Sequence, residues 1–101
     1  MREINETRIH KIKERLHEAF SPLELSVADE SHLHVGHAGY QTGKGHFALN
    51  IVAEAFTGKS LLSRHQAIYR ALGKLMLEDI HALRIKALSP QEHGHVAADQ
   101  P

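Results

Sequence analysis

The segment FTGKSLLSRHQAIY, residues 56–69, marks the point where a strand stops, a tight loop turns and an amphipathic helix begins. Before it, residues 46–53 alternate in the period of a strand with one buried face. After it, apolar residues recur every three to four positions, which predicts a helix over residues 61–76. Gly58 permits the sharp turn, and Ser60 can cap the helix by accepting from its exposed backbone donors. The rest of the chain is arranged around this strand–loop–helix unit.

Outward from this unit, the same patterns predict the remaining elements. Ile9, Ile12 and Leu16 line one side of a first helix, which ends before Pro22. A strand with alternating apolar residues follows and breaks at Asp29. Residues 32–45 hold four glycines without a sustained period, so we expect a loop there. A third strand is expected over residues 80–88, followed by a short turn of helix.

The order helix, strand, strand, helix, strand predicts a single α/β domain. A right-handed crossover makes the second and third strands parallel, whereas the first two can pair antiparallel. The expected fold is a three-stranded mixed sheet with helices packed on one face. His65 falls on the apolar stripe of the second helix and is expected to be buried and hydrogen-bonded. The expected core consists of Leu16, Phe20, Leu25, Leu49, Ile51, Ile68, Leu72, Leu83 and Ile85.

Composition narrows the function classes. Among the 101 residues, twelve lysines and arginines balance twelve acidic residues. Most nucleic-acid-binding proteins carry an excess of basic residues, so the composition argues against nucleic-acid binding. The absence of cysteine excludes a disulfide framework, a thiol nucleophile and a zinc finger built from cysteines. No apolar run approaches the length that spans a bilayer, so we expect a soluble cytoplasmic protein without a membrane partner.

Ten histidines are the unusual feature of the composition. If the second and third strands are parallel, their starts lie at the same end of the sheet, and His37, His46 and His81 gather there. Imidazole is a good ligand for zinc, copper and iron, so this end is a candidate metal site. The alternative is that the surface of a histidine-rich chain simply carries histidines. A third hypothesis is that the chain binds zinc or nickel by itself, without a partner.

Two motifs resemble a nucleotide-binding loop and a nucleic-acid-binding loop, but both differ from those loops at important positions. Residues 53–60 end in G-K-S, as a phosphate-binding loop does, but Ala53 replaces its first glycine and Phe56 is too bulky for it. Residues 36–39 read G-x-x-G, yet they precede a strand and have no adjoining lysine or arginine. No nucleophile with a matching base can be read from the spacing, so we expect no enzyme activity.

A family resemblance runs through the same segment. The pattern F-x-G-x-S-x-x-x-R-H-x-x-(I/V)-Y, followed by I-H-A-L at residues 80–83, resembles the signature of the BolA family. The signature positions include Phe56, Gly58, Ser60, His65 and Tyr69. The resemblance covers residues 1–92 and implies a class II KH-like α/β fold; residues 93–101 are expected to be a disordered tail.

The resemblance also implies a function. BolA-like proteins pair with monothiol glutaredoxins and share a bridging [2Fe–2S] cluster, in iron–sulfur trafficking or iron sensing. The implied ligands are His81, in the I-H-A-L motif, and a loop histidine, His37, with His32 and His34 as alternatives. Because two imidazoles are too few ligands and the chain has no thiolate, we expect the isolated chain to hold no stable cluster. Alone, it is expected to be a monomer.

The alternative function is that of a DNA-binding regulator of stress or morphology genes, as some bacterial members of the family are described. Its contact surface would combine Lys59, Arg64, Arg70 and Lys74. Arg64 lies at the border of the apolar stripe and either faces a partner or is an ordinary solvated arginine.

Overall fold

The computed structural model describes residues 2–34 and 43–98. Its elements in chain order are α1 (Arg2–Phe20), β1 (Glu24–Asp29), the 3₁₀ turn η1 (Ser31–His34), β2 (Gly45–Val52), the 3₁₀ turn η3 (Glu54–Phe56), α2 (Leu61–Leu72), α3 (Leu75–Glu78), β3 (Ile80–Leu88) and α4 (Pro90–Ala98). Within the described residues, no helix is long and apolar enough to cross a membrane.

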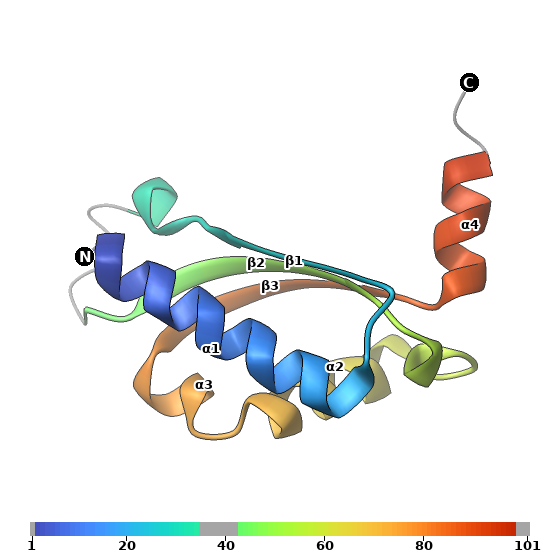
Figure 1. The fold of residues 1–101 in the computed structure, drawn as a ribbon, viewed down its shortest axis with the longest axis horizontal. Helices are drawn as coiled ribbons and strands as arrows, with labels where there is room; N and C mark the ends of the chain where they lie inside the picture. Colours follow the sequence, from blue (N-terminus) through green and yellow to red (C-terminus); the bar gives the residue numbers. More distant parts are fainter. Residues whose placement is uncertain (1, 35–42, 99–101) are drawn as a thin grey trace.

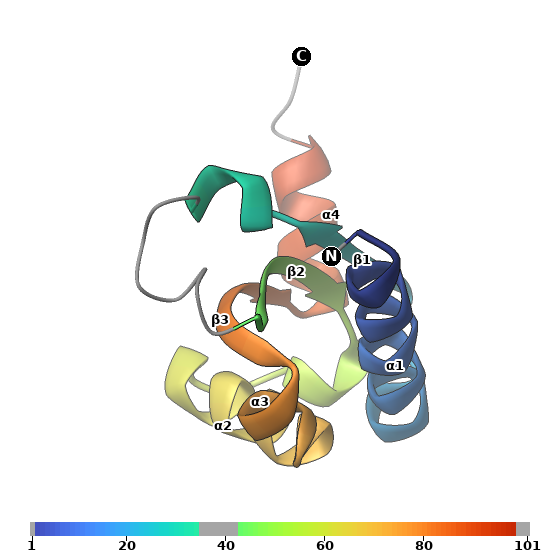
Figure 2. The same cartoon turned by 90° about the vertical axis from the view of Figure 1, so that its left-hand side faces the viewer.

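The sheet has the predicted mixed topology. Its strand order is β1-β2-β3, with β1 antiparallel and β3 parallel to the central strand. In register, Ile51 of β2 faces Leu25 of β1 and Leu49 faces Ile85 of β3. Figures 1 and 2 show α1, α2 and α3 layered on one face of this sheet, while α4 stands beyond the end of β3. The predicted α/β fold is therefore confirmed.

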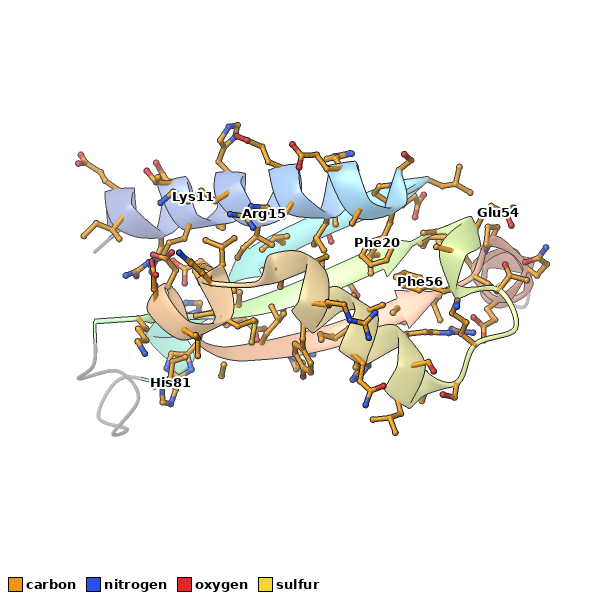
Figure 3. All side chains as sticks on the ribbon, turned by 90° about the horizontal axis from the view of Figure 1, so that it is seen from below. Lys11, Arg15, Phe20, Glu54, Phe56 and His81 are labelled. Carbon is orange, nitrogen blue, oxygen red and sulfur yellow. The ribbon has the colours of Figure 1, made fainter. Side chains whose placement is uncertain are left out.

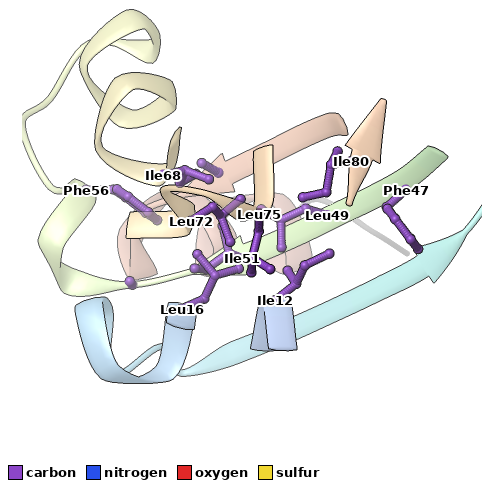
Figure 4. Packing of buried hydrophobic residues seen from close by; sticks show 12 residues of the cluster. Ile12, Leu16, Phe47, Leu49, Ile51, Phe56, Ile68, Leu72, Leu75 and Ile80 are labelled. Atoms are coloured by element: carbon purple, nitrogen blue, oxygen red, sulfur yellow. The ribbon is translucent and has the colours of Figure 1, made fainter. Parts of the chain in front are cut away.

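The core lies between the sheet and the three layered helices (Figure 4). Five of the predicted core residues are buried, and the other four pack partly buried against them, so the predicted core is confirmed. Phe47 and Phe56 are also fully buried. The ring of Phe56 lies 5.1 Å from that of Phe20, where it closes the end of the core below the last turn of α1.

The prediction of one helix over residues 61–76 is wrong, because the helix breaks at Gly73. Gly73 adopts φ 53°, a left-handed conformation that favours glycine, and its N–H donates to the Tyr69 carbonyl. The chain then turns into α3, whose Leu75 is only 6% exposed. The apolar periodicity continues through the break because both helices cover the same core.

The chain after Pro90 also differs from the expectation of a short turn followed by a disordered tail. Helix α4 continues to Ala98, and residues 99–101 lie outside the described part. A capping box starts it: the Ser89 N–H donates to Glu92 Oε1 at 2.7 Å, and the Glu92 N–H donates to Ser89 Oγ at 3.2 Å. The S-x-x-E spacing was the sequence signal for this helix.

Candidate functional site

The histidine end of the sheet is where β2 and β3 both begin. The pairing of Gly45 with Ile80 and of His46 with Ala82 places His46 and His81 side by side, with ring centroids 4.9 Å apart. This part of the predicted gathering is confirmed, whereas His37 lies outside the described residues. Figure 3 shows His81 at the end of the sheet opposite Glu54 and Phe56.

The two imidazoles are not equivalent. His46 is 4% exposed and both its ring nitrogens are buried, so it packs beneath its neighbour. His81 is exposed and can reach a ligand from outside. His32, in η1, is exposed as well. Among the described residues, no group of three or more histidine or acidic side chains is placed to hold a metal ion. This end therefore offers accessible imidazole without a closed ligand set.

A buried polar network lies at the same end. Asn5 of α1 donates through Nδ2 to Asp29 Oδ2 at 3.1 Å and to Ser31 Oγ at 3.2 Å. Arg8 donates to Asn5 Oδ1 at 2.9 Å and to Asp79 Oδ1 at 3.2 Å. Ser31 Oγ also accepts the His46 backbone N–H at 3.1 Å. The network thus joins one turn of α1 to β1, to the start of β2 and to the entry of β3.

The network changes the acidity of Asp29. Burial by itself would raise the pKa of this carboxyl, but hydrogen bonds from the Ser31 backbone and side chain and from Asn5 outweigh burial and lower it. Asp29 is therefore held as a carboxylate, the form that accepts the Ser31 N–H at 2.8 Å and the Asn5 amide.

Sequence reasoning missed this network, although α1 carries a signal for it. The buried positions Asn5, Arg8, Ile12 and Leu16 recur every three to four residues along one helical face. The predicted stripe begins only at Ile9, because apolar periodicity does not include the polar residues Asn5 and Arg8. Two polar residues on the continuation of a buried stripe indicate a buried polar cluster at that end of the helix.

On α2 the structure reverses the expected placement of two neighbours. Arg64, expected at the surface, is 5% exposed and donates to the Lys59 and Ala87 carbonyl oxygens, both at 2.9 Å, and to Glu92. His65, expected to be buried, is half-buried, with its ring 6.5 Å from that of Tyr69. The buried face of α2 runs through Arg64, Ile68 and Leu72, about one residue around the helix from the predicted stripe.

The other signature residues lie at the end of the sheet away from His81 or on the outer face of α2. Gly58 has φ 74°, and Ser60 Oγ accepts the Ser63 N–H at 3.1 Å, so both predicted local roles are confirmed. Tyr69 is 42% exposed, and Leu61 and Leu62 in the first turn of α2 are more exposed than that. Of the four basic residues expected to form a contact surface, Lys59, Arg70 and Lys74 are exposed.

A groove of about 510 Å³ lies against the three strands of the sheet and α4. Its lining includes Ser26, Asn50 and Lys86, together with His93 and Glu24, whose Nε2 and Oε2 atoms are 3.0 Å apart. His93 belongs to α4, and the other residues come from the halves of the three strands nearest α4. The groove is therefore separate from the histidine end.

Comparison with known proteins gives a consistent result. The family model described as BolA-like protein matches residues 16–92. SufE-like protein 1 of Arabidopsis thaliana is 42% identical over 81% of the chain, and the alignment spans only 24% of that longer protein. The DNA-binding transcriptional regulator BolA of Escherichia coli is 37% identical, over 81% of this chain and 75% of its own.

Among solved structures, the BolA domain of SufE1 from Arabidopsis thaliana is 42% identical, with a TM-score of 0.75 over 84% of this chain and 94% of that domain. The names of these relatives denote a regulator and BolA-type domains and no catalytic reaction. The expectation that this chain has no enzyme activity stays a prediction.

Proposed function

The chain belongs to the BolA-like family, and from that premise we propose that it is a binding module for a [2Fe–2S] cluster shared with a monothiol glutaredoxin. His81 is its principal ligand, and His37 is the second, with His32 and His34 as alternatives. The shared cluster supplies iron and sulfide for delivery, or a signal of iron supply.

The observation that supports this proposal is the exposed imidazole of His81 packed on the buried ring of His46, in a chain without cysteine. Clusters of this kind are held mainly by thiolates, and imidazole can replace thiolate on one iron. The described residues fit a donor of one or two imidazoles, and a partner must bring the thiolates. Because a protonated imidazole cannot ligate iron, the complex should weaken as pH falls.

The test is a titration of cluster-loaded monothiol glutaredoxin with this protein, followed by visible circular dichroism. We expect the wild type to replace one glutaredoxin of a symmetric dimer and change the spectrum. His81→Ala should abolish that change and His37→Ala should weaken it.

Two further histidines serve as matched controls for this titration. His10 is exposed on α1, where it pairs with Glu14 at 2.8 Å, and His65 is half-buried on α2. His10→Ala and His65→Ala should both keep the altered spectrum, because neither ring lies at the histidine end. If a folded His81→Ala protein still gives the altered spectrum, His81 is not the ligand.

A second candidate function is DNA binding, which the printed name of the Escherichia coli relative favours. With Arg64 buried, the contact surface reduces to Lys59, Arg70 and Lys74. A reader of DNA phosphates should lose affinity steeply with salt, with a slope of about −0.9 per phosphate neutralised. A chain that binds no duplex even at low salt would exclude this function.

A further inference from the structure

Asn5 is the centre of the buried polar network at the histidine end. It is 1% exposed, and both polar atoms of its side chain are used: Nδ2 donates to Asp29 and Ser31, and Oδ1 accepts from Arg8. A buried amide is retained only where its hydrogen bonds are satisfied, because burying it without partners is costly. Through these hydrogen bonds the amide joins α1 to β1 and to η1, which an apolar side chain at this position cannot do.

The hydrogen bonds of Ser31 connect the Asn5 amide to His46. Ser31 Oγ, the acceptor of the Asn5 amide, also accepts the His46 backbone N–H at 3.1 Å. Through Ser31, Asn5 therefore fixes the residue whose ring lies under His81. The Gly45 N–H donates to the Asp79 carbonyl oxygen at 3.0 Å, which ties the start of β2 to the entry of β3.

Arg8 completes the connection from the same helical turn. Its guanidinium donates to Asn5 Oδ1 and to Asp79 Oδ1, two residues before His81. The residues around this turn are tightly packed. A Cβ on Gly45 would clash with the Phe47 ring at 2.4 Å and would lie 3.1 Å from Asn5 Oδ1. One turn of α1 is thus hydrogen-bonded, through Ser31 and Asp79, to the starts of both strands that carry His46 and His81.

We propose that Asn5 is a positioning residue for the histidine site: it holds His46 against His81, so that the exposed imidazole is presented in one orientation. This inference rests on the proposed function, since the purpose of the fixed orientation is ligation. Partners that orient a ligand are worth about tenfold or more in metal affinity, which sets the size of the expected effect.

The experiment compares Asn5→Leu with Asn50→Leu. Asn50 is the second asparagine of the chain and lies exposed on β2, where its amide donates to Ser26 Oγ at 3.5 Å. The first measurement needs no cluster: amide hydrogen exchange and the nuclear Overhauser effect between the rings of His46 and His81. The reference amide is Ala53, which donates to the Leu88 carbonyl oxygen at the other end of β2.

In Asn5→Leu we expect the Gly45 and His46 amides to exchange at least about tenfold faster, while Ala53 keeps its rate and the ring contact weakens. The complex with cluster-loaded glutaredoxin should weaken about tenfold. Asn50→Leu should match the wild type in every measurement. If Asn5→Leu does not fold, Ser31→Ala removes the acceptor of the His46 N–H and should give the same local result.

Equal acceleration of all three amides would show a merely structural role and overturn the inference. An unchanged ring contact with wild-type exchange would overturn it too, as would a locally loosened variant that binds the partner as tightly as the wild type. If the wild type itself forms no complex, the proposed function fails, and the exchange and ring measurements still decide whether Asn5 positions the histidine pair.

Discussion

At the scale of single residues, Arg64 shows how a charged side chain becomes part of the fold. Its guanidinium satisfies two backbone carbonyl oxygens and pairs with Glu92, with 2.6 Å between the closest atoms. The Ala87 carbonyl lies at the end of β3 and Lys59 lies in the loop before α2. Arg64 therefore connects α2 to the loop before it, to β3 and to α4. Because its side chain is buried, it is not available for contact with a partner.

We expect Arg64→Ala to destabilise the protein by about 1–3 kcal/mol, because it leaves the buried Ala87 carbonyl without its donor. The remaining Glu92 carboxylate is partly exposed, so water can solvate it and limit the loss. Denaturant unfolding measures the change. The control is Arg70→Ala on the exposed face of the same helix, which should stay within about 0.5 kcal/mol of the wild type. Equal stability of the two variants would contradict the role of Arg64.

At the scale of elements, two local features decide where the helices lie (Figure 1). They are the break between α2 and α3 and the attachment of α4 to the end of β3. Both depend on short-range backbone chemistry. Gly73 ends α2 in a left-handed conformation, and the Ser89–Glu92 capping box starts α4 directly after β3.

Gly73→Ala should destabilise the protein by about 1–3 kcal/mol, since an alanine is strained at φ 53°. The space itself is open: the nearest atom to an added Cβ, Arg15 Nη1, is 3.8 Å away, so any loss comes from the backbone. Gly94→Ala is the matched control, because Gly94 lies inside α4 with nothing within 4 Å of an added Cβ. It should be neutral or stabilise the helix by about 0.5–1 kcal/mol. Thermal unfolding of both variants checks this, and a Gly73→Ala protein as stable as the wild type would contradict it.

The anchoring of α4 should depend on pH. Hydrogen bonds from Arg64 and from the Ser89 backbone lower the pKa of Glu92 from 4.5 to about 2. Because the folded value lies below the unfolded one, this contribution to stability is complete above about pH 4.5 and is lost as pH falls toward 2. Carboxyl-carbon NMR of Glu92 measures the pKa directly.

Two variants test the cause of this shift. Arg64→Ala should return the pKa of Glu92 toward its ordinary value, and Glu92→Gln should lose less stability than the wild type on acidification. A wild-type Glu92 that titrates at an ordinary pKa would contradict the ion pair as the anchor of α4.

At the scale of the whole molecule, one apolar layer joins elements from both halves of the chain. Ile12 and Leu16 of α1 meet Leu49 and Ile51 of the central strand and Leu72 of α2 (Figure 4). The histidine end and the signature loop lie at opposite ends of this layer, as the labels of His81 and Phe56 in Figure 3 show. A loss of packing in the middle should therefore weaken the fold as one unit.

Ile51→Ala should lower the free energy of unfolding by about 2–5 kcal/mol, because the side chain is 1% exposed and leaves a cavity. Leu77→Ala removes a side chain that is 73% exposed and should change stability by no more than about 0.5 kcal/mol. Denaturant unfolding compares the two. A wild-type midpoint for Ile51→Ala would refute the assignment of the core.

The sequence by itself determined the order of the first two helices and the three strands, the pairing of the strands and the meeting of His46 with His81, but not the break at Gly73 or the length of α4. Strand and helix periods are local properties of the chain, and a crossover between parallel strands has one preferred hand. From these, the strand starts fall at one end of the sheet without any knowledge of side-chain contacts. The resemblance to the BolA signature led to the same fold.

Only the tertiary structure decided how α2 is rotated, and with it which of Arg64 and His65 is buried. The residues that hydrogen-bond the buried Arg64 side chain, Ala87 and Glu92, are 23 and 28 residues away. The network of Asn5 and Arg8 likewise reaches Asp29 and Asp79, 24 and 71 residues along the chain. Apolar periodicity cannot locate such contacts, because a buried polar side chain is stable only where distant segments supply its hydrogen bonds.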